Sequence, residues 1–139
     1  QLKKGKPCWH TVRSLEVTIA EHPLTLHILS ELLEKRIAAV KFHPLPAFIG
    51  VHGYFNYVGP KKGFDDDSQK FAIHIDDTHH NKTLSEIGIT LVHEIVHIFY
   101  KVDGGFGGVE EVIEAYAQRF YKEHASFVDD LVQQLRTKS

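Results

Sequence analysis

The sequence predicts an α+β fold, in which a small, twisted and mainly antiparallel sheet packs against a long buried helix and further helices. The first observation is a nearly continuous apolar segment, Leu84–Val102, whose length suits a helix and exceeds that of most strands. The second is an alternation of apolar and polar residues over Lys70–Asp76, which is typical of a strand with one buried face. With 139 residues, the chain is long enough for one core, so we expect a single domain over residues 1–139.

The first third of the chain predicts a lead-in, a strand and a helix. Residues 1–10 are polar and basic, and we expect a loose N-terminal segment there. Leu15, Val17 and Ile19 alternate with polar residues, which predicts a first strand. In the next segment apolar residues recur at helical spacing opposite charged ones, which predicts an amphipathic helix over one face of the sheet. Its apolar positions are Ile28, Leu29, Leu32, Leu33 and Ile37.

The middle of the chain predicts strands separated by a surface loop. Phe48–Val58 is rich in aromatic and β-branched residues and contains glycines, which predicts one or two short strands. Gly59–Ser68 contains proline and three adjacent aspartates, which predicts a solvated loop. After the strand at Lys70–Asp76, a polar turn contains His79 and His80, whose side chains we expect to be exposed.

The last part of the chain predicts three helices. Thr83 and Glu86 have the spacing of a capping box, which predicts the start of the long helix. The glycine-rich segment Asp103–Gly108 should end that helix and act as a connector. Apolar residues at helical spacing then predict two more helices, at Val109–Tyr121 and Phe127–Leu135.

The long helix contains the motif His93-Glu94-x-x-His97. Residues four apart lie on one helical face, about 6 Å from each other, so both imidazoles can reach one ion. We expect that ion to be Zn²⁺, which takes imidazole ligands, needs a third protein ligand and keeps a fourth position for water when it is catalytic. Burying His93 and His97 is costly unless the rings are paired, and a metal would pair them. The alternative is ordinary interior packing of the two rings.

Four acidic residues that follow the motif are candidates for the third ligand: Asp103, Glu110, Glu111 and Glu114. Asp103 is disfavoured because Tyr100 stands where a chain that turns back towards the metal would need glycine. If the helix continued, Asp103 would lie about 240° round the axis from His97.

The helix after the glycines offers the three glutamates. Glu114 is preferred because it lies next to the apolar stripe of that helix and should face inward, while Gln118 one turn later could orient a ligand imidazole. Glu110 and Glu111 lie in the first turn, where acidic residues are expected anyway because they complement the helix dipole. Glu111 remains open as the alternative ligand.

Two segments, Thr90–His97 and Glu114–Phe120, resemble the ImmA/IrrE-type metallopeptidases and related small phage and mobile-element zincins. In that group an H-E-x-x-H helix is followed by a helix with E-x-x-A-N, whose glutamate is the third zinc ligand. The resemblance implies a zincin-like fold and a gluzincin-type zinc site made of His93, His97 and Glu114. Gln118 stands where the family usually has asparagine. The resemblance covers about residues 70–121, and the first 69 residues match no pattern known to us.

We therefore expect a zinc metallopeptidase in which Glu94 is the catalytic base that takes a proton from the attacking water. An extended peptide or protein substrate would dock on the strand Phe71–Asp76 by β-augmentation. Four residues are candidate donors to the oxyanion: Tyr54, Tyr57, Tyr100 and His74.

Two other functions are compatible with the motif. One is a zinc-containing protein-binding module without proteolytic activity, against which Glu94 argues because a structural zinc site needs no base. The other is a zinc-dependent nuclease of the ribosomal-RNA maturation type. Those proteins need a third histidine soon after the motif, and none occurs between His97 and His124.

Composition narrows the partners and the compartment. The net charge of -2 provides no basic surface for nucleic acid or an anionic membrane, and no apolar run approaches the length that spans a bilayer. The single cysteine, Cys8, cannot form a disulfide within the chain, and no signal sequence is visible, so we expect the cytoplasm. The chain has no methionine, so we expect Gln1 to result from processing.

Overall fold

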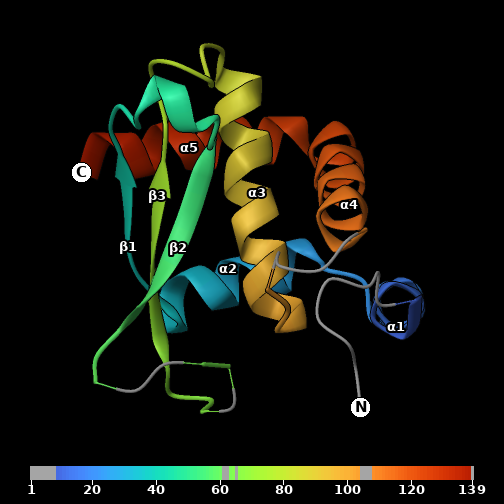
Figure 1. Cartoon of the computed structure of the whole chain (residues 1–139). Helices are drawn as coiled ribbons and strands as arrows, with labels where there is room; N and C mark the ends of the chain where they lie inside the picture. The colour runs from blue at the N-terminus through green and yellow to red at the C-terminus, as the bar shows by residue number, and fades with distance from the viewer. Residues whose placement is uncertain (1–8, 61–62, 65, 104–107, 139) are drawn as a thin grey trace.

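The computed structural model describes residues 9–60, 63–64, 66–103 and 108–138, and these form the expected α+β fold. The elements in chain order are α1 (Trp9–Glu21), α2 (Leu26–Lys35), β1 (Ile37–Phe42), the short 3-10 helix η1 (Ala47–Ile49), β2 (Gly53–Val58), β3 (Lys70–Ile75), α3 (Leu84–Tyr100), α4 (Val109–Glu123) and α5 (Ala125–Lys138). Figure 1 shows the three strands side by side, with α3 next to β2 and α4 beyond α3. The predicted fold class is confirmed.

The sheet has the strand order β1-β3-β2. β1 pairs with β3 in parallel, and β2 pairs with β3 antiparallel, so the sheet is mixed rather than mainly antiparallel. β3 is the central strand and is hydrogen-bonded on both sides. An extended partner can pair only with a strand whose backbone groups are free, so the prediction that Phe71–Asp76 is a docking edge is wrong. The edges of the sheet are β1 and β2.

α3 is the central helix of the molecule. It contacts α1, α2, α4 and α5, and it also packs on β2 and β3. The predicted capping box is confirmed: the Thr83 side chain accepts the backbone N–H of Glu86, and the Glu86 carboxylate accepts the backbone N–H of Thr83. Four apolar side chains of α3 have no exposed surface: Leu91, Val92, Ile95 and Val96. The motif is therefore carried by the most enclosed helix among the described elements.

The predicted strand at Leu15–Ile19 is wrong, because these residues lie in α1. Leu15 and Ile19, four residues apart, are buried, whereas Val17 between them is 47% exposed. The residues that pack are thus at helical spacing, and Val12 continues the same face one turn earlier. The predicted lead-in, residues 1–10, lies outside the described residues up to position 8, and Trp9 is the first residue of α1.

The predicted helix at Ile28–Ile37 is present, but it ends earlier and a strand follows. Thr25 caps α2, since its side chain accepts the backbone N–H of Ile28. Ile37 belongs to β1, a strand that the sequence did not reveal because its alternation is weak and only Val40 is buried.

The region from Phe48 to Val58 contains one strand, β2, after the short helix η1. In the loop before β3, the Asp66 carboxylate accepts both the backbone N–H and the hydroxyl of Ser68, as expected for a solvated turn. His79 is exposed as predicted, whereas His80 is half-buried. The connector after α3 is outside the described residues at positions 104–107.

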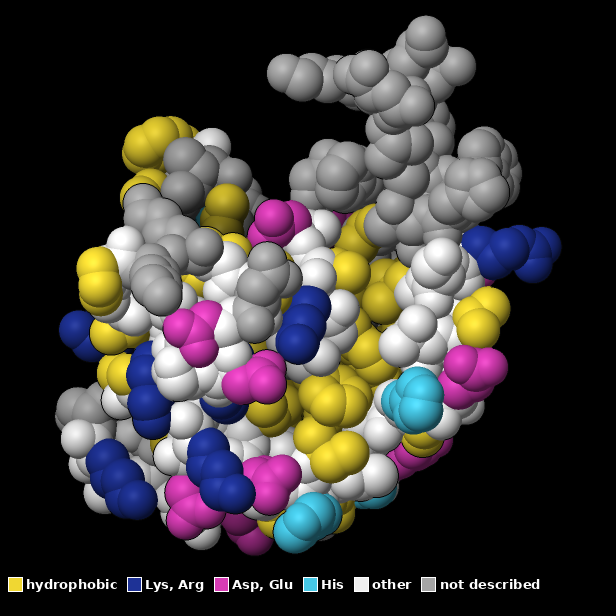
Figure 2. Space-filling model, turned by 90° about the horizontal axis from the view of Figure 1, so that it is seen from below, with side chains coloured by type: hydrophobic (Ala, Val, Ile, Leu, Met, Phe, Trp, Pro, Cys, Tyr) yellow, Lys and Arg dark blue, Asp and Glu magenta, His cyan; other side chains and the backbone are white. Residues whose placement is uncertain are grey.

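The surface carries mixed charges. On the face shown in Figure 2, Lys and Arg side chains lie among Asp and Glu side chains rather than in one basic area. A search of the described helices finds none with the length and hydropathy needed to traverse a lipid bilayer.

Candidate metal centre

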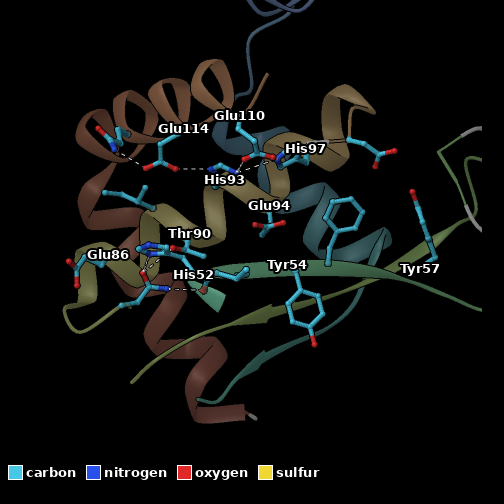
Figure 3. A pocket seen from close by; sticks show the side chains of 18 residues that line it. His52, Tyr54, Tyr57, Glu86, Thr90, His93, Glu94, His97, Glu110 and Glu114 are labelled. Atoms are coloured by element: carbon cyan, nitrogen blue, oxygen red, sulfur yellow. Dashed lines mark hydrogen bonds and ion pairs between the residues drawn. The ribbon is translucent and has the colours of Figure 1, made fainter. Parts of the chain in front are cut away.

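A cleft of ≈ 880 Å³ lies between β2 on one side and α3 and α4 on the other. Figure 3 shows β2 running along the cleft beneath the motif helix. The residues that carry its chemistry are His93, Glu94 and His97 from α3 and Glu110 and Glu114 from α4. All of the candidate site residues predicted from the sequence line this cleft except Glu111, Tyr100 and His74.

His97 is fixed by the end of α3. Its Nδ1 lies 2.8 Å from the carbonyl oxygen of Val102, and because a carbonyl can only accept, Nδ1 must carry the proton. The carbonyl reaches back because Lys101 adopts a left-handed conformation with φ 58° at the helix end. In the neutral ring the other nitrogen, Nε2, therefore bears a free lone pair. The side chain is 4% exposed.

His93 is held in the same way by α4. Its Nδ1 lies 2.7 Å from Oε1 of Glu114, whose other oxygen accepts a 2.8 Å hydrogen bond from the side-chain amide of Gln118. The neutral ring then donates through Nδ1 and leaves its Nε2 as an acceptor. Gln118 acts on the imidazole through Glu114, one step further away than the sequence suggested.

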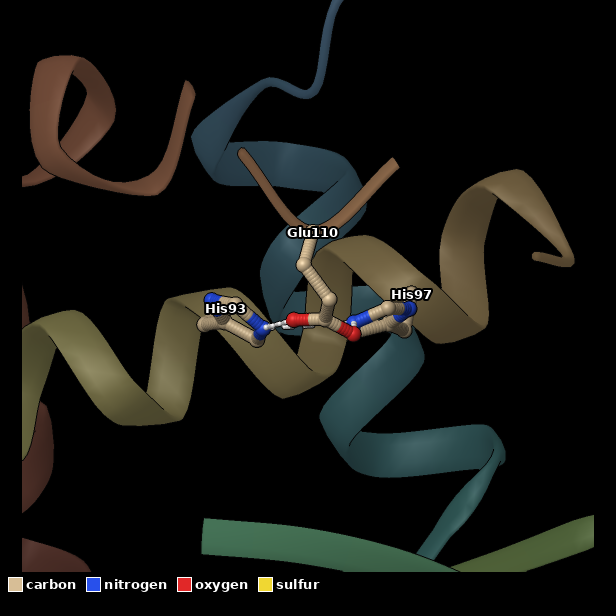
Figure 4. Close-up of side chains that lie close together, drawn as sticks. All are labelled: His93, His97 and Glu110. Carbon is tan, nitrogen blue, oxygen red and sulfur yellow. Dashed lines mark hydrogen bonds and ion pairs between the residues drawn. The ribbon is translucent and has the colours of Figure 1, made fainter. Parts of the chain in front are cut away.

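Three acceptors converge between the two rings (Figure 4). The Nε2 atoms of His93 and His97 are 3.2 Å apart, and the Glu110 carboxylate lies 2.9 Å from the first and 3.0 Å from the second. Ligand atoms around a tetrahedral zinc with bonds of about 2.0–2.1 Å are separated by about 3.3 Å. His93, His97 and Glu110 are therefore close enough together to bind one metal ion.

The local charges favour a cation at this point. Burial lowers the pKa of His93, but the hydrogen bond with Glu114 and the charges of Glu94 and Glu110 outweigh it, and the pKa rises above its ordinary value. Burial and the charge of His93 lower the pKa of His97, despite the nearby Glu110. His97 is thus neutral, as metal binding requires, while the surroundings of His93 attract positive charge.

Glu114 remains a prediction as the third ligand, because its carboxylate contacts the far nitrogen of His93 and Glu110 holds the position between the rings. Both side chains lie on one face of α4, four residues apart. Glu111 is exposed and is not part of this His–His–Glu cluster. Asp103 lines the cleft but does not belong to the cluster either.

Glu94 lies beside the cluster and points into the cleft (Figure 3). The residue is only 6% exposed, yet within the described part of the chain its carboxylate accepts no hydrogen bond. Burial raises the pKa of Glu94 to about 7, with the charges of Glu110 and Glu114 adding to the rise and His93 opposing it. A buried carboxylate without a protein partner is available to a bound water or substrate.

His52 lines the cleft and was missed by sequence reasoning. Its Nδ1 lies 2.9 Å from Oδ1 of Asn81. The same oxygen accepts a hydrogen bond from the hydroxyl of Thr90, so Asn81 fixes the orientation of the His52 ring relative to α3. Asn81 is positioned in turn by Asp76, a completely buried carboxylate. No motif marks His52, and only its place just before β2 could have drawn attention to it.

The predicted oxyanion donors divide into two groups. Tyr57 and Tyr54 both border the cleft, but the ring of Tyr54 stacks on His74 and points away from Glu94 (Figure 3). The hydroxyl of Tyr100 donates instead to the carbonyl oxygen of His22, and His74 bonds His43 and Asn56 beside the ring of Tyr54. Tyr100 and His74 are therefore engaged elsewhere.

Comparison of the chain with protein-family models, curated proteins and solved structures found no match. The case for a function rests on the cleft itself.

Proposed function

We propose that this protein is a zinc-dependent metallopeptidase whose ion is held by His93, His97 and a carboxylate of α4. The observation that carries the proposal is the convergence of two imidazole lone pairs and a carboxylate at tetrahedral spacing, beside a buried carboxylate that accepts no hydrogen bond from any described residue. Three facing acceptors repel one another unless a proton or a cation lies between them. Two imidazole nitrogens and a carboxylate oxygen form a ligand set that zinc commonly takes in catalytic sites, and the open cleft leaves room for water.

Zinc bound there would supply Lewis-acid activation of a water molecule and of the peptide carbonyl. Glu94 accepts the proton of the attacking water and later delivers it to the leaving amine. Its burial suits both steps, since a pKa raised to about 7 makes the carboxylate a stronger base and lets the resulting carboxyl group hold the proton at neutral pH until the amine takes it. The hydroxyl of Tyr57, which also lines the cleft, is a candidate donor to the oxyanion.

β2 borders the cleft and is an edge strand, so we propose that an extended peptide pairs with it. Gly53 brings this strand close to α3. A Cβ atom at this position would lie 2.6 Å from Cγ2 of Thr90 and 2.9 Å from the carbonyl oxygen of His74. The bare backbone at Gly53 keeps the strand next to Glu94, where the scissile bond must lie.

Glu94→Gln is the direct test of the activity. This change keeps the shape of the side chain and removes the base, so the variant should retain one zinc per chain and lose peptide hydrolysis by at least about 100-fold. Zinc content by mass spectrometry and cleavage of a peptide library are the two measurements. Hydrolysis that survives in Glu94→Gln refutes the role of Glu94.

The two candidates for the third ligand can be separated by zinc affinity. The contacts favour Glu110 as the ligand and Glu114 as the residue that orients His93, whereas the family resemblance favours Glu114. Loss of an orienting partner costs about 10- to 100-fold in metal affinity, and loss of a ligand costs more. The larger loss, in Glu110→Gln or in Glu114→Gln, identifies the ligand. Glu111→Gln, an exposed neighbour on the same helix, is the matched control.

A binding module without catalysis is the remaining alternative. It predicts bound zinc but no hydrolysis of any peptide. It also gives no reason for the buried Glu94 carboxylate, which has no hydrogen-bond partner in the part of the chain that the structure describes. A nuclease is less consistent with the site, since none of the described residues that line the cleft is a lysine or an arginine and phosphate binding needs a basic surface.

A further inference from the structure

The cleft is lined by acidic side chains at its centre and at both ends. Five carboxylates line it: Glu86, Glu94, Asp103, Glu110 and Glu114. None of the described residues that line it is a lysine or an arginine. Even with a divalent ion at the His93–His97 pair, the carboxylates outnumber the positive charges, so the cleft as a whole remains negative.

Glu86 marks one end of the cleft. Its Oε1 accepts the backbone N–H groups of Lys82 and Thr83, at 2.7 Å and 3.0 Å. These hydrogen bonds lower the pKa of Glu86, so the carboxylate is ionised at neutral pH and held in place. Glu86 is exposed, so its remaining oxygen is accessible from the cleft.

Asp103 marks the other end. It follows α3 and lies near Tyr57, where its charge adds to burial in raising the pKa of the tyrosine. Figure 3 shows Glu86 and Tyr57 at opposite ends of the cleft, with Glu94 between them over β2. The buried Glu94 carboxylate, which has no hydrogen-bond partner among the described residues, shows that the middle of this acidic cleft is built to receive a ligand.

We propose that the cleft selects peptides that carry a lysine or arginine on each side of the bond to be cleaved. This inference rests on the proposed peptidase function. Glu86 precedes Glu94 by eight residues of α3, which is about 12 Å along the helix, while a peptide extended along β2 advances about 3.3 Å per residue. Long side chains about two or three residues from a bond at Glu94, on either side, therefore reach towards Glu86 and towards Asp103. Each end thus offers a cationic side chain an exposed acidic partner.

Binding to the zinc-loaded Glu94→Gln variant tests the preference without catalysis. Three fluorescent peptides should be identical except for two residues, one on each side of the bond to be cleaved. These two residues are both lysine in the first peptide, both glutamine in the second and both glutamate in the third. We expect the dissociation constants to rise in that order, with about a threefold step for each charge, as is typical of exposed ion pairs. The differences should shrink when the salt concentration is raised from about 0.02 to 0.5 M.

Two substitutions locate the preference. Glu86→Gln keeps the capping-box hydrogen bonds because an amide oxygen can accept them, and it removes only the charge. Asp103→Asn removes the charge at the other end of the cleft. Each should reduce the lysine-over-glutamate ratio about ninefold, because lysine and glutamate differ by two charges at that end. Asp130→Asn, an exposed residue of α5 that does not line the cleft, should leave the ratio unchanged.

The outcomes separate this inference from the function on which it rests. Equal binding of the three peptides, or a preference untouched by both cleft variants, overturns the charge selection, even if the wild-type enzyme cleaves neutral peptides. Failure of the zinc-loaded wild type to cleave any peptide, together with the expected binding order, upholds the charge selection and contradicts the peptidase.

Discussion

His97 donates a hydrogen bond from Nδ1 to the carbonyl oxygen of Val102, 2.8 Å away, at the point where the chain leaves α3. The turn that makes this possible is the left-handed conformation of Lys101. The end of the helix therefore decides which nitrogen of His97 faces His93 and Glu110. The way the helix ends thus sets the orientation of the His97 ring.

This relationship predicts opposite effects of two substitutions at Lys101. Lys101→Val should destabilise the protein by about 1–2 kcal/mol, because a β-branched residue is strained in the left-handed region, and it should weaken zinc binding by displacing the Val102 carbonyl. Lys101→Gly should keep zinc affinity and raise stability by up to about 1 kcal/mol. Urea denaturation and zinc competition titration measure both. Unchanged zinc affinity in Lys101→Val would show that the turn at Lys101 does not affect zinc binding by His97.

Asp76 organises the turn that supports the floor of the cleft. Its carboxylate has no exposed surface and accepts the backbone N–H groups of Leu45, Thr78, His79, His80 and Asn81. Burial alone raises the pKa of Asp76, but these hydrogen bonds outweigh it and hold the pKa well below the ordinary value of 3.8.

Asp76→Asn should cost about 3 kcal/mol, because an amide has one acceptor oxygen for donors that the carboxylate satisfied with two. A depressed pKa in the folded state stabilises the protein above the unfolded pKa of about 4, and this contribution is lost as the pH falls below that value. The wild type should therefore lose stability more steeply than Asp76→Asn between about pH 4 and pH 2. Parallel slopes in thermal unfolding over that range would rule out Asp76 as the source.

The pKa shift of Glu94 has the opposite sign to that of Asp76. Because burial raises its pKa in the folded state, metal-free protein should lose stability as the pH rises from about 4.5 to about 7. Glu94→Gln removes that cost and should stabilise the metal-free protein at pH 8 by about 2 kcal/mol, with little difference at pH 4.5. Thermal unfolding in the presence of a chelator checks this. A lower melting temperature of the variant at pH 8 would mean that the carboxylate has a stabilising partner.

Gly53 tests the close packing of β2 on α3. Gly53→Ala places a methyl group against Thr90 and the His74 carbonyl, so the strand must move away from the helix. We expect a loss of about 1–3 kcal/mol in stability, as for overpacked sites, and weaker peptide binding with unchanged zinc content. The double variant Gly53→Ala, Thr90→Ser removes the nearest methyl group and should recover part of both losses. If neither stability nor peptide binding recovers in the double variant, the contact with Thr90 is not the source of the strain.

The sequence predicted those parts of the fold that carry a long or complete pattern. α3 has an extended apolar run and a full capping box, and β3 alternates over its whole length. The prediction for α1 was wrong because Val17 is an exposed valine between the buried residues Leu15 and Ile19, which gives the apolar–polar alternation of a strand. β1 has a single buried residue and no turn signal before it, so nothing separated it from α2.

The motif residues were predictable for a related reason, since their spacing is local to one helix. The choice among the glutamates depends on how α4 lies against α3, which no local pattern contains. Glu110 was attributed to the helix dipole, although its four-residue spacing from Glu114 already placed both on one face. His52 was not predicted as a residue of the cleft because the placement of its ring depends on a hydrogen bond to Asn81, which is 29 residues away in the chain.

X-ray absorption at the zinc edge of the purified protein tests the central claim most directly. The account predicts one zinc per chain in a four-coordinate site, with two imidazole nitrogens at about 2.0–2.1 Å and oxygen completing the shell, and His97→Ala should remove one imidazole. A wild-type protein that binds no zinc, or a zinc spectrum without imidazole scattering, would contradict it.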